Sequence, residues 1–116
     1  MYNSMSLQLL LAASTDSPGQ RLTLFALLTL GIIESLAHGL LSATDVLRVF
    51  FHAENCLFVR KHLRAKTADV VMSHGAQLPD LFEVLPTAEA QREFQRELAT
   101  MRTLCLKLLE QKQLVA

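Results

Sequence analysis

The segment from Ser17 to Gly39 constrains the fold of this chain more than any other, because it carries both ends of a helix and is apolar on almost every side. Ser17 is a favoured N-cap residue, and Pro18 suits the first helical position. Gln20 completes a capping box, and Gly39 is typical of the residue that follows a helix C-terminus. Because a helix that is hydrophobic all round is buried, the sequence predicts a central helix over about residues 18–38.

The remaining chain follows the helical period of 3.6 residues, without an alternating strand pattern or an internal repeat. A long C-terminal helix is expected over about residues 88–112. The sequence therefore predicts an all-α fold, a compact single-domain bundle of six or seven helices. The shorter helices are expected over Leu7–Ala13, from a Ser42 cap to a break at Glu54–Asn55, and over Asn55–Arg64, Ala68–His74 and Pro79–Leu85, with Thr67 as a cap and Gly75 as a stop.

The composition is that of one neutral domain with a substantial core. The chain has 116 residues, of which 51% are hydrophobic. Its 11 basic and 11 acidic residues give a formal net charge of 0, so no overall field attracts nucleic acid or an anionic membrane. The same neutrality favours self-association or a protein partner. Residues 1–16 are expected to form a short helix or a frayed arm.

The predicted location is the cytoplasm. Leu7–Ala13 resembles the apolar part of a signal peptide, but no Lys or Arg precedes it, as such a signal normally requires. The uncharged run Leu22–Ile33 is too short for a bilayer, which takes about 20 apolar residues, so we expect no membrane span. Cys56 and Cys105 lie in apolar helical patterns and are predicted to be buried free thiols, which a reducing compartment allows.

Glu34 and His38 lie one helical turn apart on the narrow polar strip of the central helix. They could form an acid–base or metal-binding pair on the floor of a ligand pocket. An ordinary i,i+4 pair explains them as well, because a cationic His is favoured near a helix C-terminus. Gly31 on the same strip lowers helix propensity by about 1 kcal/mol relative to Ala, which predicts close packing of another backbone.

His52 and Cys56 have the spacing of a helical metal-binding pair, and His62 and His74 follow them. The spacing matches no zinc finger or ribbon, and the expected break at Asn55 separates the first two residues, so we predict no metal and no cofactor. The sequence has no phosphate-binding Gly loop, nucleophile elbow or metalloprotease motif. These features give no catalytic residue and favour a protein without enzymatic activity.

Three acidic residues require a structural explanation. Asp80 and Glu83 are expected in the first turn of a short helix, where carboxylates complement the helix dipole. Glu97 falls on the apolar side of the long C-terminal helix. A carboxylate there is expected to meet a cationic or backbone partner, or to lie at an interface.

The only basic run in the sequence consists of Arg60, Lys61, His62, Arg64 and Lys66. A solvated helix face is the simplest interpretation. A docking surface for an acidic partner is the second interpretation, and weak nucleic-acid binding is the third, because aromatic residues that could stack on bases are scarce.

Two stretches, LTLGIIESLAHGLLSATDV and SHGAQLPDLFEVLP, resemble a small bacterial family of uncharacterised all-helical proteins over about residues 22–86. The family pattern has an apolar helix of the form L-G-I-I-E-x-L-x-x-G, then a short helix with acidic residues after a Ser, and later a more acidic turn. Gln77 and Pro79 replace two carboxylates of that turn here. The resemblance implies an all-helical fold and no particular activity.

Taken together, these features favour a non-enzymatic protein–protein interaction protein that forms a homodimer or binds a protein partner. An immunity or antitoxin-type binder or a small adaptor would be of this kind. Phe51, at the edge of a wide apolar face, and Leu106, outside the main stripe of its helix, join the basic run as the candidate interaction surface. Two alternatives stay open: a small ligand-binding or enzymatic bundle with a pocket beside Glu34 and His38, and a weak nucleic-acid binder that uses the basic run.

Overall fold

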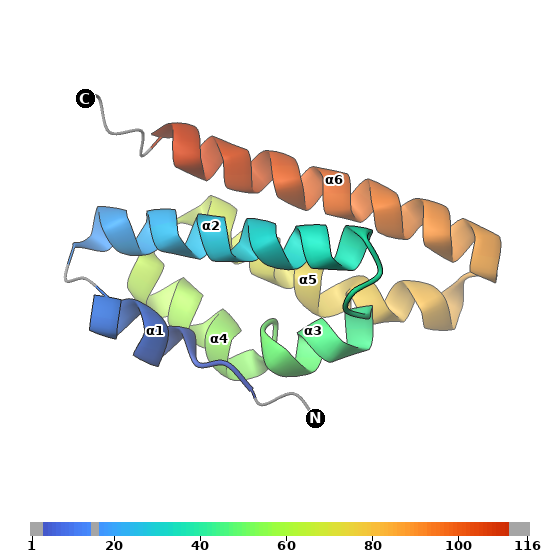
Figure 1. The fold of residues 1–116 in the computed structure, drawn as a ribbon, viewed down its shortest axis with the longest axis horizontal. Coiled ribbons are helices and arrows are strands. Elements are labelled where there is room, and N and C mark those ends of the chain that lie inside the picture. Colours follow the sequence, from blue (N-terminus) through green and yellow to red (C-terminus); the bar gives the residue numbers. More distant parts are fainter. Residues whose placement is uncertain (1–3, 15–16, 112–116) are drawn as a thin grey trace.

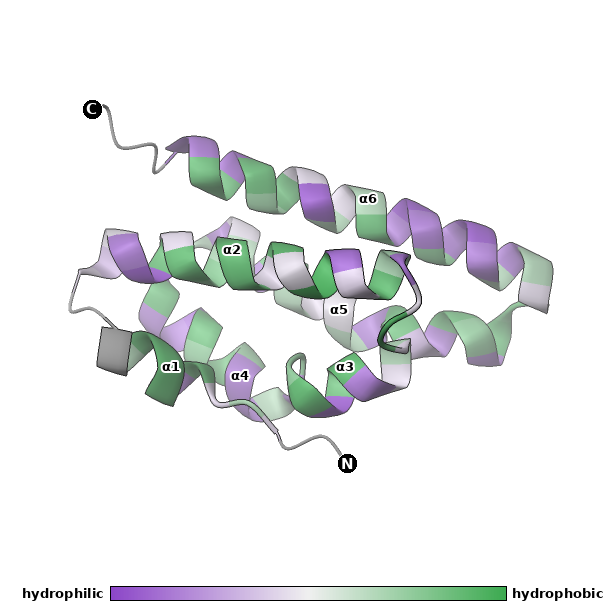
Figure 2. Ribbon diagram, viewed as in Figure 1, coloured by the Kyte–Doolittle hydropathy of each residue, from purple (hydrophilic) through white to green (hydrophobic). Residues whose placement is uncertain are grey.

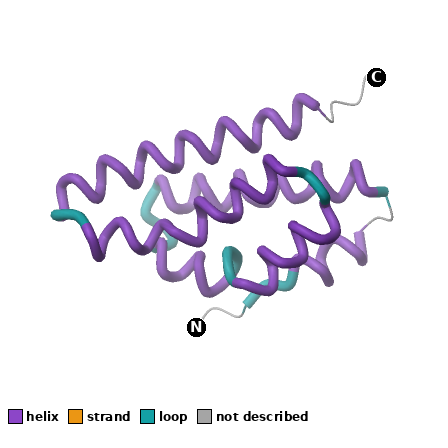
Figure 3. Tube along the Cα trace, turned by 180° about the vertical axis from the view of Figure 1, so that it is seen from behind, coloured by secondary structure: helices purple, strands orange, loops and turns teal. Residues whose placement is uncertain are grey.

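The computed structural model of the protein describes residues 4–14 and 17–111. In these ranges the chain consists of helices joined by short loops, without a strand (Figure 1, Figure 3). This confirms the predicted all-α bundle. In chain order, the elements are α1 (Leu7–Ser14), α2 (Pro18–Ala37), α3 (Ala43–Val49), α4 (Ala53–Phe58), the π-helical turn η1 (Val59–Leu63), α5 (Lys66–Val84) and α6 (Thr87–Gln111).

The longest helices, α2 and α6, run antiparallel along one side of the molecule, with α5 behind α2 (Figure 1). The most extensive helix contacts join α6 to α5 and to α2. The shorter helices α1, α3 and α4 cover the other side, where α1 contacts α2 and α4, and α3 contacts α5. The described residues form a body of 45 × 30 × 23 Å around one hydrophobic core.

The core draws on every helix. The rings of Phe25 and Phe50 stack with centroids 6.5 Å apart, and Phe51 meets Phe50 edge-on at 5.0 Å. α6 matches the predicted long helix, although its expected last residue, 112, lies outside the described residues. The stripe predicted for α6 packs into the core, with Leu104 and Leu109 partly exposed; its buried members are Ala90, Phe94, Leu98, Met101, Cys105 and Leu108.

Both predicted ends of α2 are confirmed. The Ser17 hydroxyl accepts a hydrogen bond from the backbone N–H of Gln20 at 3.3 Å. At the other end, Gly39 has a φ of +73°, and the N–H of Leu40 donates to the carbonyl of Ser35 at 2.9 Å. This is the hydrogen bond that closes a helix when a residue past its end turns left-handed, a conformation that favours Gly.

The burial of α2 is less complete than its composition predicts. One side of α2 is buried from Leu22 to Leu36, but Leu24 and Leu27 on the other side are 36% and 52% exposed. α2 packs against α1, α6 and η1 and keeps an outer face open, so it lies at the edge of the core. The whole helix is also long and apolar enough to cross a membrane, a test that the core helix of a soluble protein passes as well.

The break between α3 and α4 comes earlier than the sequence predicted. α4 already begins at Ala53, so Asn55 lies inside a helix instead of ending one. The start of α4 is set by His52, whose Nδ1 accepts a hydrogen bond from the backbone N–H of Asn55 at 3.5 Å. A His side chain acting as the N-cap is an uncommon choice, and the sequence analysis did not consider it.

Residues 66–84 form one helix, α5, where the sequence predicted two short ones. Gly75 does not end a helix: it is buried in the middle of α5, where the Phe51 ring packs so closely that an added Cβ would overlap it. Pro79 lacks the N–H that would reach the Gly75 carbonyl, but the packing of α5 against α3 and α6 keeps the helix continuous. Thr67 lies within the first turn and is not the cap, because the N-cap position is Ala65.

The continuity of α5 also moves its acidic residues. Asp80 and Glu83 lie near the C-terminal end of α5, where the helix dipole disfavours carboxylates, so the predicted stabilisation at a first turn is wrong. The acidic residue in the first turn of α5 is Asp69.

Candidate functional site

A shallow hollow, whose described lining residues are all leucines, lies between α1 and α2. Its volume is about 420 Å³. Three of its side chains are substantially exposed, at 44% for Leu10, 36% for Leu24 and 52% for Leu27. Hydrophobic residues dominate both α1 and the middle of α2 in Figure 2. We call this feature the leucine hollow; its lining residues are Leu10, Leu11, Leu24, Leu27 and Leu28.

Gly31 follows Leu27 by one turn on the outer face of α2, and it is exposed. The sequence predicted that another backbone packs against this residue. Nothing in the described part of the chain does so, since an ideal Cβ built on Gly31 meets no atom within 4 Å. The open space beside Gly31 therefore extends the outer face of α2 beyond the leucine hollow.

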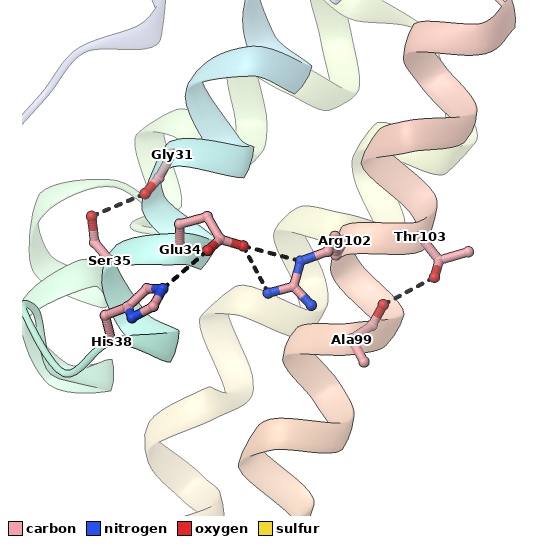
Figure 4. A network of polar contacts seen from close by, with 7 residues as sticks. All are labelled: Gly31, Glu34, Ser35, His38, Ala99, Arg102 and Thr103. Carbon is pink, nitrogen blue, oxygen red and sulfur yellow. Dashed lines mark hydrogen bonds and ion pairs between the residues drawn. The ribbon is translucent and has the colours of Figure 1, made fainter.

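Beyond Gly31, the same outer face becomes charged (Figure 4). The Arg102 guanidinium of α6 donates two hydrogen bonds to Oε1 of Glu34, from Nε at 3.2 Å and from an Nη at 2.9 Å. His38 Nε2 lies 3.4 Å from the other oxygen of Glu34. Glu34 and His38 thus lie close together, as their spacing in the sequence suggested. The sequence analysis did not identify Arg102 as a partner of Glu34, because the two residues are far apart along the chain.

This geometry is that of a solvent-exposed ion pair that joins two helices. The side chains of Glu34 and His38 are 53% and 71% exposed, and Arg102 is 37% exposed. A bidentate Arg fixes the carboxylate, and solvent screens the pair, so the arrangement joins α2 to α6 rather than preparing Glu34 for proton transfer.

Leu106 continues the outer face onto α6. α2 and α6 are antiparallel, and Glu34 of α2 contacts Arg102 of α6. Leu30 lies one turn before Glu34, and Leu106 lies one turn after Arg102, so this geometry brings the two leucines to the same side of the α2–α6 contact. Leu106 is 46% exposed. Phe51, the other apolar residue of the predicted interaction surface, is only 1% exposed, because it fills the space beside Gly75, so its assignment to a surface is wrong.

The basic run lies on the π-helical turn and the bend after it. Arg60 is ion-paired with Asp69 of α5 at 3.5 Å, and Arg64 adopts a left-handed φ of 50° that ends η1. Lys61, Arg64 and Lys66 are exposed. The nearby ring of Phe58 is buried and stacks on His62, with centroids 5.1 Å apart, so it presents no face for a nucleic-acid base.

Glu97 has a side-chain partner in His74 of α5. Its Oε2 lies 2.8 Å from Nδ1 of His74 across the α5–α6 contact, and each side chain is about one-third exposed. A shallow cleft of about 310 Å³ borders the pair, with Gln77 and Asp80 among its polar residues. His74 and Glu97 join two helices that already share the largest contact, which makes a structural role sufficient.

The other predicted metal-ligand candidates serve local structure. His52 Nε2 contacts the Ser4 hydroxyl and the Met5 carbonyl, each at 2.9 Å, while Cys56 donates weakly to the Phe51 carbonyl at 3.4 Å. Within residues 4–14 and 17–111, no group of three or more His, Cys, Asp or Glu residues is placed to hold a metal ion. Cys56 and Cys105 are both free thiols, as predicted, but only Cys105 is buried, and Cys56 is partly exposed.

A cavity of about 470 Å³ opens where the α2–α3 loop meets the end of α5 and the start of α6. Its lining includes apolar residues such as Phe82 and Phe94 and neutral polar residues such as Ser42 and Gln95. Neither Glu34 nor His38 is part of the lining, which contains no titratable side chain. The cavity therefore offers hydrogen bonds and apolar contact but no acid or base.

Comparison with models of protein families, with curated proteins and with solved structures finds no match to this chain. The resemblance to the bacterial helical family stays a prediction.

Proposed function

We propose that this chain is a non-enzymatic protein–protein interaction protein whose docking surface is the leucine hollow and the adjoining outer face of α2. An adaptor or an immunity or antitoxin-type binder is a protein of this kind. The proposal differs from the sequence-based one in the location of the surface, which moves from Phe51 and the basic run to α1 and α2.

The observation that carries the proposal is the leucine hollow itself. Other large apolar residues are exposed too, including Leu40 and Val84, but single exposed residues are ordinary on a protein surface. The leucine hollow differs because its side chains come from two neighbouring helices and line one depression. A contiguous apolar depression is the usual mark of a surface that another molecule covers.

The candidate catalytic geometry supports the same conclusion. Glu34 is held by Arg102, Glu97 by His74, and Asp69 by Arg60. The most spacious cavity described above has no titratable lining residue. Acid–base catalysis requires a proton-transfer group facing the substrate, and none of these arrangements provides one.

Affinity capture with matched variants tests this proposal. Leu27→Glu places a charge in the leucine hollow. Leu57→Glu is the matched control, because Leu57 of α4 is 47% exposed and Leu27 is 52% exposed. We expect wild type and Leu57→Glu to retain the same protein, be it another protein or tagged copies of this chain, and Leu27→Glu to lose it, with all three equally folded by circular dichroism. Equal recovery by all three variants, or recovery of nothing by wild type, would remove the support for a docking role of this surface.

A further inference from the structure

Nothing in the described part of the chain requires a Gly at residue 31. Gly in the middle of a helix costs about 1 kcal/mol relative to Ala. At Gly75 the fold requires it, because the Phe51 ring occupies the place of a side chain. At Gly31, which is exposed, an added Cβ meets no atom of the described chain within 4 Å. What Gly31 uniquely permits is the close approach of a surface from outside the chain.

We infer that Gly31 receives the α2 helix of a second copy of this chain, packed antiparallel across the outer face of α2. The inference rests on the proposed function, since it assigns the partner of the same surface.

The spacing along α2 is self-complementary. Leu24 and Gly31 are seven residues apart, so they lie on one stripe of the helix, separated by two turns. A two-fold axis that passes between Leu27 and Leu28 would bring Leu24 of each copy over Gly31 of the other. The two contacts are equivalent, as a symmetric dimer requires. In each contact, the Leu24 side chain of one copy packs into the open space beside Gly31 of the other. Leu27 of both copies would then meet beside the axis.

The charges of the outer face agree with this arrangement. The centre of this face is uncharged, and Glu34 and His38 lie at its C-terminal end. In the antiparallel pair, Glu34 of one copy comes opposite residue 21 of the other, within the first helical turns. The N-terminal turns of a helix carry partial positive charge, which favours a carboxylate. A parallel pair would instead place the two Glu34 carboxylates close together.

The neighbouring helices α1 and α6 widen the surface that a second copy would contact. α2 is about 30 Å long, but a single helix stripe is narrow, and stable interfaces bury about 800 Å² per partner. Leu10 of α1 flanks the stripe in the leucine hollow, and Leu106 of the neighbouring helix α6 is 46% exposed. The Glu34–Arg102 pair on the same face disfavours lipid as the occupant, because a charged pair loses its hydration in a bilayer.

Sedimentation equilibrium of Gly31→Leu tests the packing. We expect wild type to form a dimer in a concentration-dependent manner, and Gly31→Leu to raise the dimer dissociation constant about ten-fold or more, because the added side chain fills the space that Leu24 would occupy. The monomer should stay folded, since a Cβ at Gly31 meets nothing in its own chain. Ala53→Leu, which adds the same bulk at an exposed position of α4, should dimerise like wild type. A wild-type protein that stays monomeric from micromolar to millimolar concentration, or a Gly31→Leu variant that dimerises as well as wild type, would overturn the inference.

Oxidative cross-linking tests the direction of the helices. In a Cys56→Ser background, Leu27→Cys should form a disulfide-linked dimer, because the two copies of residue 27 lie beside the axis. Gln20→Cys should not, because an antiparallel pair separates the two copies of residue 20 by about 20 Å along the helix axis. Cross-linking through both positions would indicate a parallel pair, and cross-linking through neither would place the contact elsewhere; both results contradict the inference.

The two proposals fail in different ways. If wild type is a monomer but still retains another protein that Leu27→Glu loses, the second copy is the wrong occupant and the docking function stands. If wild type neither dimerises nor retains a protein, both proposals fail together.

Discussion

Two glycines in the interiors of long helices stand there for opposite reasons. Gly75 is buried beneath Phe51, whereas Gly31 faces open space. We expect Gly75→Ala to lower the free energy of unfolding by about 1–3 kcal/mol, because the strain of displacing the Phe51 ring outweighs the gain in helix propensity. Urea denaturation measures the change. At concentrations where both proteins are monomeric, Gly31→Ala should instead be as stable as wild type or more stable, and a Gly75→Ala variant of that stability would refute the packing argument.

The buried thiol of Cys105 and the partly buried thiol of Cys56 make stability depend on pH in the alkaline range. Burial raises the pKa of the Cys105 thiol from 9.0 to about 11, and it also raises that of Cys56. A raised pKa means that the folded state holds the proton longer than the unfolded state does. The contribution of the protonated thiol to the free energy of unfolding is therefore complete below pH 9.0, and it is lost as the pH rises from 9.0 toward 11.

Thermal melting over that pH interval checks this expectation. Cys105→Ala lacks the titrating group, so its melting temperature should fall less steeply with pH than that of wild type, whatever its absolute stability. Identical slopes for the two proteins would show that Cys105 does not contribute to the alkaline loss of stability.

Among the helices, α1 owes its position to one buried side chain of α4. Asn55 is 2% exposed, accepts a hydrogen bond from Leu7 N–H at 3.0 Å, and donates to the carbonyls of Met5 and Phe50 at 3.0 and 2.8 Å. It thus satisfies one free donor at the start of α1 and holds the preceding segment against the α3–α4 corner. The sequence analysis took the same residue for a helix breaker, which is its usual role when exposed.

We expect Asn55→Ala to destabilise the fold by about 2–4 kcal/mol, because it leaves the Leu7 N–H and the Phe50 carbonyl without partners. Hydrogen exchange should then show faster exchange at Leu7 and in the following turn of α1 than in α6. Glu54→Ala changes the exposed neighbour in the same helix and should leave both properties unaltered. Unchanged protection of Leu7 in Asn55→Ala would mean that α1 is held by its leucines alone.

The helices whose ends depend on local chemistry were predictable, and those held by packing were not. The ends of α2 follow from Ser17 and Gly39, whose effects reach only a few residues along the chain. α5 also contains residues that commonly end helices, Gly75 and Pro79, but contacts with α3 and α6 keep the helix intact. A sequence pattern states what Gly and Pro favour locally and not which distant ring lies against them.

For the whole molecule, the sequence predicted the helical bundle but not its exposed surface. The periodicity of α2 identified apolar residues nearly all round, without indicating which of them the other helices cover. Which of them stay exposed depends on where α1 and α6 dock, and this left Leu24 and Leu27 outside and enclosed Phe51. The Glu34–Arg102 pair was missed for the same reason, since 68 residues separate its members.

The response of self-association to salt follows from the neutral charge and the apolar surface. The protein has a formal net charge of 0, and the inferred contact is centred on leucines, so moderate NaCl has little long-range electrostatic interaction to screen. Sulfate, by contrast, strengthens the burial of apolar surface because it is excluded from protein surfaces. We therefore expect the dimer dissociation constant to change little with NaCl and to fall in sodium sulfate at matched ionic strength, as measured by sedimentation equilibrium. If NaCl instead weakened association steeply, charged residues would dominate the contact, and the leucine hollow would not be its centre.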